Sequence, residues 1–275
     1  MRAMKTCRTI DLGTIGYGEA AALQERLVAA RKTGAAPDLL LFCEHPHVIT
    51  LGRNGKCEHL HASEELLRRR GVEFHHSNRG GDITYHGPGQ IVGYPILDLN
   101  GIRRDVVWYV RQLEECMIRA TSSFGIQAFR VPGRTGVWVR ATEGGDGART
   151  ILEDRSGVRP DAGVGTESSD SPAAILEKLA AIGVHISRWV TSHGFAYNVS
   201  TDLRFFDLIT PCGIAGCRAT SVEKLLGAPV ERGDAVARLS AGFAEAFDLE
   251  LSPMEAAEWN GWLTGEGVPA SVRAS

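Results

Sequence analysis

The feature that most constrains the fold is a helical apolar pattern that begins near residue 106. Apolar or small side chains recur there every three or four positions, at Val106, Val110, Leu113, Met117, Thr121 and Phe124. This spacing predicts the longest amphipathic helix of the chain, and one face of that helix must pack on a sheet. Cys116 lies on the same helix, and we expect it to be a core residue rather than a catalytic one.

Short apolar segments typical of strands alternate with further helical segments along the chain. Strands are predicted at residues 39–42, 128–131, 136–139, 184–190 and 196–199. Helices are predicted at residues 19–31, 63–71 and 236–247, with two more opened by capping boxes at Thr220–Glu223 and Ser252–Glu255. The Thr220 helix should end at Gly227.

Residues 141 to 174 interrupt this alternation with GGDG, TESSDSP and no apolar periodicity. We interpret them as an insertion loop, expected to be largely disordered because it holds too little apolar surface to fold. The chain is otherwise predicted to be one catalytic domain over residues 1–275, with its core at about residues 10–250.

Composition narrows the class of protein. A net charge of −3 gives no basic surface of the kind that nucleic acid or anionic membranes need, so neither is expected as a partner. No apolar run has signal-peptide or membrane-spanning length, and a cytoplasmic location is predicted. In that reducing compartment the six cysteines should be free thiols.

The first segment that carries chemistry is Arg79-Gly-Gly-Asp-Ile-Thr-Tyr-His-Gly-Pro-Gly-Gln90. Glycines let the backbone approach a ligand closely, while Arg79, Thr84, His86 and Gln90 supply polar groups to contact it. We interpret this segment as one wall of a ligand site. A plain glycine-rich hairpin turn is the alternative.

Two further segments offer a base and a nucleophile. Lys178 begins an apolar, strand-like run, where burial would disfavour its charged form and let it act as a base. Cys212 lies between Pro211 and Gly213 on a tight turn, which can expose and position a thiol. Each has a common structural explanation as well, since a lysine at a strand edge is usually just solvated.

Two C-x-H-x-H segments, Cys43–His47 and Cys57–His61, superficially suggest zinc. Their spacing is not that of zinc ligands, so no metal is predicted, and their histidines are interpreted as surface or polar-network residues. No phosphate-binding GxxxxGK loop is present, and no cofactor is predicted.

At these residues the sequence resembles the lipoyl(octanoyl) transferases. The RGGxxTYHGPGQ segment at 79–90, the run from Lys178 through Asn198, and TPCGI around Cys212 carry the resemblance, with HPHVITLGRN at 45–54 as a looser fourth match. The likeness covers most of residues 10–250 outside the insertion. It implies an α+β fold with a twisted mixed β-sheet flanked by helices, shared with lipoate and biotin protein ligases.

The resemblance also implies an activity. An octanoyl group would pass from octanoyl-acyl carrier protein to Cys212 as a thioester, with Lys178 activating the thiol, and then to a lysine of a lipoyl-domain protein. The acceptors would be the lipoyl domains of 2-oxoacid dehydrogenase complexes and the glycine cleavage H protein. The acyl pocket would involve Arg79, Gly80, Gly81, Asp82, Ile83, Thr84, Tyr85, His86, Ala181, Ile182, Gly183, Gly194, Phe195 and Ala196.

Two other functions fit the sequence less well. An ATP-dependent lipoate or biotin protein ligase on the same fold would need no nucleophilic cysteine. A non-catalytic module that binds acyl groups or lipoyl domains would make Cys212 and Lys178 incidental. Both alternatives are separated from the transferase by whether the protein itself becomes covalently acylated.

Overall fold

The computed structural model describes residues 5–141, 176–210, 217–254 and 259 of the chain. Two features predicted from the sequence fall outside these residues. Cys212 is one, and the predicted insertion at 141–174 is the other, apart from Ala141 at its start.

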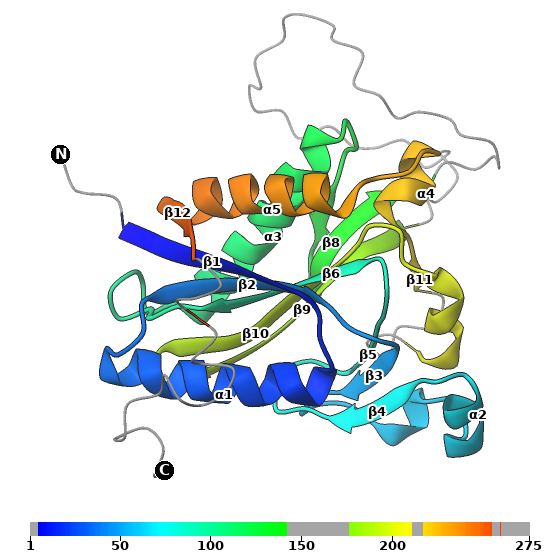
Figure 1. The fold of residues 1–275 in the computed structure, drawn as a ribbon. Helices are drawn as coiled ribbons and strands as arrows, with labels where there is room; N and C mark the ends of the chain where they lie inside the picture. Colours follow the sequence, from blue (N-terminus) through cyan, green and yellow to red (C-terminus); the bar gives the residue numbers. More distant parts are fainter. Residues whose placement is uncertain (1–4, 142–175, 211–216, 255–258, 260–275) are drawn as a thin grey trace, which may run out of the picture.

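A twisted mixed sheet forms the centre of the molecule (Figure 1). Its strands are β1 (Lys5–Thr14), β2 (Asp38–Glu44), β6 (Gln90–Ile96), β7 (Phe129–Val131), β8 (Arg134–Arg140), β9 (Leu176–Ser187), β10 (Val190–Asn198), β11 (Arg218–Ala219) and β12 (Leu249–Pro253). Within the described residues their order is β12-β1-β2-β6-β10-β9-β8-β7, with β11 beside β9. The pairs β1–β2, β1–β12 and β9–β11 are parallel and the others antiparallel.

A smaller sheet lies beside one end of the first. It has the order β4-β3-β5 and consists of β3 (Val48–Leu51), β4 (Glu73–His76) and β5 (Ile83–His86). The described part of the chain also contains the helix α2 (Glu64–Arg69) and two short 3-10 helices, η1 (Cys57–His59) and η2 (Leu203–Leu208). Aromatic rings of η2 stack on this sheet, since Phe205 lies 5.1 Å from the ring of Tyr85.

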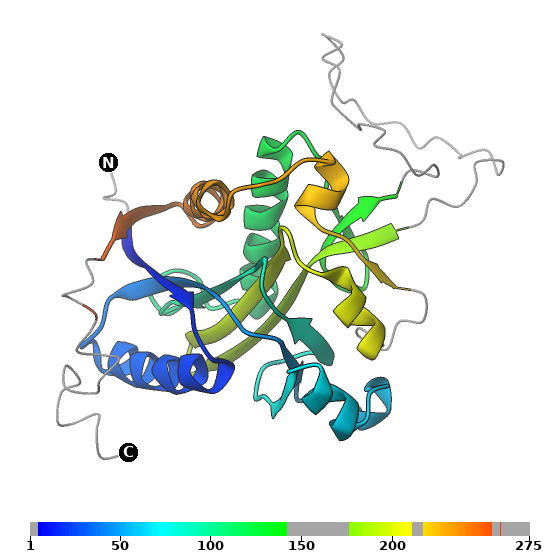
Figure 2. The same cartoon turned by 45° about the vertical axis from the view of Figure 1, so that its right-hand side comes forward.

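Helices cover both faces of the large sheet. The helix α1 (Tyr17–Thr33) lies on one face, and α3 (Val106–Ser123), α4 (Val222–Leu226) and α5 (Arg232–Phe247) lie on the other (Figures 1 and 2). The strand β2 shows why both faces are filled: Leu39 and Leu41 pack toward α1, whereas Leu40 and Phe42 pack toward α3 and α5. Alternate side chains of a strand point to opposite faces, so a continuous apolar strand requires two apolar layers.

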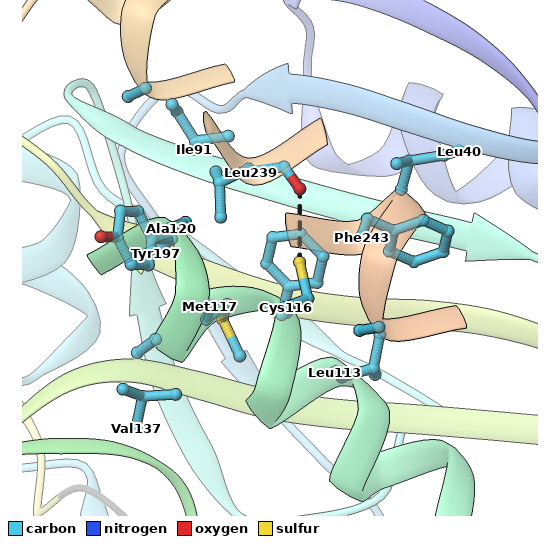
Figure 3. Packing of buried hydrophobic residues seen from close by; sticks show 14 of the residues in the cluster. Leu40, Ile91, Leu113, Cys116, Met117, Ala120, Val137, Tyr197, Leu239 and Phe243 are labelled. Carbon is cyan, nitrogen blue, oxygen red and sulfur yellow. Dashed lines mark hydrogen bonds between the residues drawn. The ribbon is translucent and has the colours of Figure 1, made fainter. Parts of the chain in front are cut away.

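The larger core cluster lies between the sheet and the α3–α5 pair (Figure 3). Leu113, Cys116 and Met117 of α3 are fully buried there, against Leu239 and Phe243 of α5. The Cys116 thiol donates to the carbonyl oxygen of Leu239 at 3.4 Å, and burial raises its pKa. The prediction that Cys116 is a core residue is confirmed.

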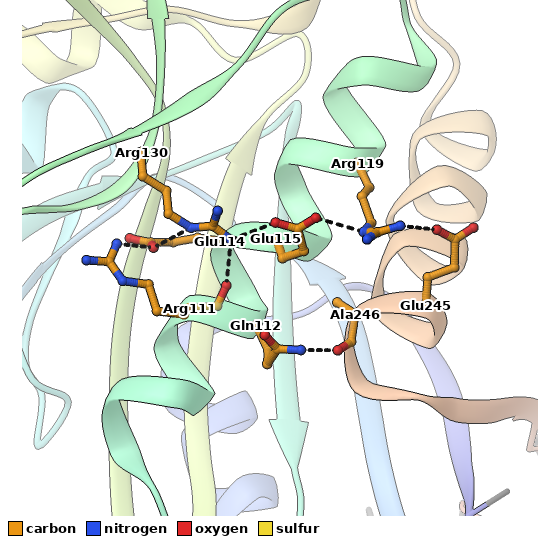
Figure 4. Close-up of polar contacts among 8 residues, drawn as sticks. All are labelled: Arg111, Gln112, Glu114, Glu115, Arg119, Arg130, Glu245 and Ala246. Carbon is orange, nitrogen blue, oxygen red and sulfur yellow. Dashed lines mark hydrogen bonds and ion pairs between the residues drawn. The ribbon is translucent and has the colours of Figure 1, made fainter. Parts of the chain in front are cut away.

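Ion pairs and hydrogen bonds of charged side chains also hold α3 against β7, β8 and α5 (Figure 4). The Glu114 side chain is 1% exposed, and its Oε2 lies 2.7 Å from Arg111 Nη1 and 3.1 Å from Arg130 Nε. Its Oε1 accepts a hydrogen bond of 3.1 Å from the backbone N–H of Gly136 in β8. On the exposed side of the same helix, Arg119 bridges Glu115 and Glu245 of α5.

Most of the predicted elements are confirmed. The predicted helices at 19–31, 63–71, 106–124 and 236–247 correspond to α1, α2, α3 and α5, and the strands at 39–42, 128–131, 136–139 and 196–199 fall on β2, β7, β8 and β10. Ser63 caps α2 by accepting a hydrogen bond from Leu66 N.

Three predictions of elements were wrong in detail. The strand predicted at 184–190 is interrupted, because Arg188 and Trp189 take positive φ angles of 51° and 65° and turn the chain between β9 and β10. The helix α4 is capped by Ser221 rather than Thr220, although it ends at Gly227 as expected. Ser252 lies in β12, where pairing with β1 overrides the capping signal; Glu255 lies outside the described residues.

Four of the described cysteines, Cys7, Cys43, Cys57 and Cys116, are free thiols, as predicted from composition. Among the residues described, no helix is both long and apolar enough to cross a membrane.

The close approach of α3 and α5 gives a stability prediction. A Cβ on Gly242 would lie 2.4 Å from the Cys116 carbonyl oxygen, so Gly242→Ala must push the two helices apart. We expect a loss of about 2 kcal/mol in the free energy of unfolding, measured by urea denaturation. Gly233→Ala is the matched control in the same helix, where a Cβ meets nothing within 4 Å. It should gain roughly 0.5 kcal/mol from helix propensity. Equal effects of the two changes would contradict this packing.

Candidate active site

A pocket of about 680 Å³ opens between the segment 79–86 and strands β6, β9 and β10 of the large sheet. Lys178 and thirteen of the fourteen residues predicted to bind the acyl group line it. These thirteen are Arg79, Gly80, Gly81, Asp82, Ile83, Thr84, His86, Ala181, Ile182, Gly183, Gly194, Phe195 and Ala196. Two parts of the chain that are far apart in the sequence, residues 79–86 and the β9–β10 hairpin, therefore meet around one cavity.

Tyr85 is the exception among the predicted residues. Its side chain is fully buried on the other side of β5, where its hydroxyl lies 2.7 Å from His47 Nδ1. Its ring stacks with Phe205 of η2. The alternation of side chains along β5 explains this, because neighbours in a strand point to opposite sides. Tyr85 supports the wall of the pocket from behind.

Small residues form the floor of the pocket. In the antiparallel pair β9–β10, Ala181 is opposite Ala196 and Gly183 is opposite Gly194. Side chains directly opposite each other in a sheet share a face, so these two pairs leave a shallow slot on that face. The next strand, β6, adds the side chain of Val92. The slot is apolar and narrow, which suits an alkyl chain.

The glycine-rich segment closes the pocket from above. The backbone N–H of Gly80 donates to the Val184 carbonyl oxygen at 2.8 Å, which ties this segment to β9. The Arg79 side chain is buried, and its guanidinium donates to the Thr50 carbonyl oxygen at 2.7 Å and to the Gly80 carbonyl oxygen at 3.1 Å. The glycine-rich run is thus a pocket wall and not a plain hairpin turn.

A β-bulge turns Lys178 into the pocket. Val137 pairs with Ala180 but Trp138 pairs with Lys178, so Leu179 is an extra residue on β9. Leu179 packs in the core toward α3, whereas Lys178 lies on the pocket side although it is only 8% exposed. Its Nζ lies 5.3 Å from the centre of the Trp138 ring, a cation–π contact. Without the extra residue, Lys178 and Ala181 would face opposite sides.

Gly136 makes the bulge possible. Its φ of +123° lies in a backbone region that glycine adopts readily and other residues rarely adopt. A Cβ at this position would lie 2.5 Å from the Ala180 carbonyl oxygen and 2.8 Å from Lys178 Cε. Its N–H is the group that donates to the buried Glu114 of α3. The helix on the far face of the sheet therefore helps to fix the strand opposite Lys178.

A directional chain of hydrogen bonds crosses the inner wall of the pocket. Asn198 Nδ2 donates to the Thr220 carbonyl oxygen at 3.0 Å, so its Oδ1 is the atom that accepts from Gln90 Nε2 at 2.9 Å. Gln90 Oε1 then accepts from Nδ1 of His86 at 2.7 Å. Thr220 N in turn donates to the Lys178 carbonyl oxygen at 3.0 Å. The backbone around the lysine and the glycine-rich segment are thus held by one network.

Two histidines of the pocket, His86 and His193, are neutral at pH 7. Burial lowers the pKa of His86 to about 3, with further lowering by His45 and Arg79. Burial also lowers the pKa of His193 to about 4, and the Arg79 charge adds to this. A neutral His86 that donates from Nδ1 keeps Nε2 unprotonated, and Nε2 faces the Thr50 hydroxyl at 3.4 Å.

The histidines of the two C-x-H-x-H segments belong to polar networks, as predicted. His45 donates from Nδ1 to the Ile15 carbonyl oxygen at 2.8 Å, and its Nε2 accepts from the Tyr94 hydroxyl at 2.7 Å. His59 lies at the pocket, with Nδ1 2.5 Å from Asp82 Oδ2. His61 contacts Thr210 Oγ1 at 2.6 Å.

Sequence reasoning missed several residues of the pocket. Tyr17, Trp138, His193, Asn198 and Cys217 all line it but were not assigned to it. Asn198 could have been found from strand alternation, because it shares a face with Ala196 and Gly194 in a segment already assigned to the site. His193 directly precedes Gly194 but has a positive φ of 54°, which regular alternation does not anticipate. Tyr17 and Trp138 come from distant elements and gave no local signal.

Comparisons with known proteins agree with this architecture. The structure is similar to a bi-partite lipoate protein ligase of Thermoplasma acidophilum, studied together with its E2 lipoyl domain, with a TM-score of 0.65 at 14% identity over 96% of this chain and 92% of the other. It is also similar to a lipoate-protein ligase A bound with ATP, with a TM-score of 0.61 at 13% identity over 96% and 94% of the two chains. The predicted α+β fold of the lipoate ligase type is thereby confirmed.

Relatives found by sequence share a much higher identity with this chain than these structures do. An octanoyltransferase of Solibacter usitatus is 46% identical over 91% of this chain and 97% of its own length. One of Acidobacterium capsulatum is 49% identical over 78% of each chain. Residues 16–244 match the model of the lipoyl protein ligase A/B catalytic domain. The chain therefore belongs to the lipoyl protein ligase A/B catalytic domain family and, within it, to the octanoyltransferases, which are acyltransferases.

The low pKa of His86 gives a prediction about acid stability. Unfolded histidine has a pKa near 6.5 and native His86 one of about 3, so below pH 6.5 only the unfolded state takes up this proton. The contribution of neutral His86 to the free energy of unfolding is retained above pH 6.5 and lost as the pH falls toward 3. Between pH 6.5 and 4.5, the wild type should lose about 2 kcal/mol more unfolding free energy than His86→Asn, which keeps a donor near Nδ1.

Urea denaturation of both proteins at the two pH values measures this difference. The comparison between the two isolates His86, because the carboxylates that titrate in this range are common to both. Parallel losses of stability in the wild type and in His86→Asn would show that the histidine is not held neutral.

Proposed function

We propose that the protein transfers an octanoyl group from octanoyl-acyl carrier protein to a lysine of lipoyl-domain proteins, through a thioester on Cys212. The observation that carries the proposal is the pocket itself: an apolar slot that ends at an almost fully buried lysine, Lys178. The names of the relatives supply the octanoyl group. We take residues 1–275 as a single catalytic domain.

The described residues on either side of Cys212 support its role as the nucleophile. Thr210 N donates to the His59 carbonyl oxygen at 2.8 Å, and His59 lines the pocket. After the gap, Cys217 lines the pocket as well, and Ala219 pairs with Lys178 in the sheet. The described residues nearest to Cys212 in the sequence on either side, Thr210 and Cys217, therefore contact a pocket residue or line the pocket themselves.

In this proposal Lys178 serves both half-reactions. It takes the proton of the Cys212 thiol, and the thiolate attacks the carbonyl carbon of the carrier thioester. The carrier thiolate leaves and receives the proton from Lys178. In the second half-reaction the amine of the acceptor lysine attacks the Cys212 thioester and gives a proton to Lys178, which returns it to the departing Cys212 thiolate. An amide replaces a thioester, so the exchange needs no ATP.

The acceptors follow from the family. The Thermoplasma acidophilum ligase with the same fold has been studied with an E2 lipoyl domain. We propose lipoyl domains of 2-oxoacid dehydrogenase complexes and the glycine cleavage H protein as acceptors here. We further propose that the enzyme acts in the cytoplasm, where a nucleophilic cysteine stays reduced.

Intact-mass spectrometry after mixing with octanoyl-acyl carrier protein tests the proposal. The wild type should gain the mass of one octanoyl group, and Cys212→Ala should gain none. Lys178→Arg keeps the charge but cannot exchange a proton at neutral pH, so its acylation should slow by at least about a hundredfold.

Cys217→Ala is the matched control, because Cys217 is a second thiol of the same pocket. It should be acylated like the wild type. Acylation that survives Cys212→Ala but disappears in Cys217→Ala would move the nucleophile to Cys217. Turnover that requires ATP and leaves every cysteine unmodified would identify a ligase instead.

A further inference from the structure

A second cavity adjoins the candidate active site. It has a volume of about 600 Å³ and lies between α1 and the end of the β9–β10 hairpin. Two residues, Tyr17 and His193, line both cavities. Their side chains therefore form the partition between the acyl slot and the space beyond it.

Hydrogen bonds hold the partition in place from several elements. His193 Nε2 lies 2.5 Å from Asn78 Oδ1, and the Tyr17 hydroxyl lies 2.8 Å from Ser77 Oγ. The backbone N–H of His193 donates to Gln24 Oε1 of α1 at 2.8 Å. Asn78 and Ser77 directly precede Arg79, so the partition is joined to the segment that closes the pocket from above.

The partition lies at the end of the slot away from the lysine. His193 is opposite Val184 in the sheet, six residues along β9 from Lys178, and a strand covers roughly 20 Å in that number of residues. The small pairs Ala181–Ala196 and Gly183–Gly194 lie between them. An acyl chain whose carbonyl is near Lys178 therefore points its methyl end at His193.

We propose that Tyr17 and His193 set the longest acyl chain that the pocket accepts, so that saturated chains of medium length fit and longer ones do not. This inference rests on the proposed function, because it uses Lys178 as the reacting end. A longer chain would have to displace the His193 ring from its hydrogen bond with Asn78, or the Tyr17 hydroxyl from its hydrogen bond with Ser77.

Space for a longer chain exists behind the partition. On the α1 side of the second cavity, Ala21, Val28 and Ala29 offer apolar surface beside the polar side chains of Gln24, Glu25, Lys32 and Thr33. Removing the His193 ring would join the two cavities through a shared opening. The partition, and not the total volume of the two cavities, thus limits the length of the acyl chain.

The test compares His193→Gly with the wild type. Glycine suits this position because the backbone φ at His193 is +54°, which alanine would tolerate poorly. The rates of acylation by octanoyl- and dodecanoyl-acyl carrier protein are measured by intact-mass spectrometry. The ratio of the dodecanoyl rate to the octanoyl rate should rise at least about tenfold in the variant, since even one methylene is worth that much in a tight apolar pocket.

Two further variants make the result decisive. Asn78→Ala leaves the histidine but removes its partner, and it should shift the ratio in the same direction by a smaller factor. His185→Ala is the matched control, because His185 lines the second cavity and not the first. It should leave the ratio unchanged. A wild-type ratio in both His193→Gly and Asn78→Ala, or an equal rise in His185→Ala, overturns the proposal.

Calorimetric binding of free octanoate and dodecanoate separates this inference from the proposed function. Binding needs no acyl transfer, so the preference for chain length can be read even when no adduct forms. A preference that shifts toward dodecanoate in His193→Gly, with no octanoyl adduct on the wild type, would overturn the proposed function and support the partition. An unshifted preference overturns the partition.

Discussion

One extra residue in a strand determines where the reactive lysine points. Because Leu179 is inserted opposite Val137 and Trp138, it takes the core position that alternation would otherwise give to its neighbour, and Lys178 faces the pocket. The insertion depends on Gly136, whose backbone no other residue adopts easily, and Gly136 is held in turn by the buried carboxylate of Glu114. Burying that carboxylate is tolerable because two arginines and a backbone N–H compensate it.

The pocket forms where the small sheet lies beside one end of the large sheet. The large sheet contributes a floor whose facing side chains are small, and the segment after β4 lies over that floor because Gly80 is hydrogen-bonded to Val184. Polar residues are kept to the walls, where His86, Gln90 and Asn198 satisfy one another. The arrangement separates an apolar slot from a fixed polar network, which is how a site can hold an alkyl chain and still control protons.

Much of the fold could be predicted from the sequence, because the spacing of apolar side chains indicates which face of an element is buried. The helix at 106–124 and the strand at 39–42 were predicted from side-chain spacing alone. The turn at Arg188–Trp189 was not, since two non-glycine residues with positive φ carry no local signal. Thirteen of the fourteen residues that the resemblance assigns to the acyl pocket do line it, whereas Tyr17 and Trp138 reach the pocket through tertiary packing. Tyr85 lies in the predicted motif but faces the opposite side of β5, a detail that depends on the register of one short strand.

The two ends of the described chain meet in the sheet, since β12 pairs in parallel with β1 along five positions, from Lys5–Leu249 to Thr9–Pro253. A chain that leaves the ribosome from its N-terminus exposes one edge of β1 until β12 has been made. Such an edge offers unpaired N–H and C=O groups to any neighbouring strand. Because β12 shields β1, nascent chains of this protein pass through a period of vulnerability to edge-to-edge association that lasts until Leu249–Pro253 have been synthesised.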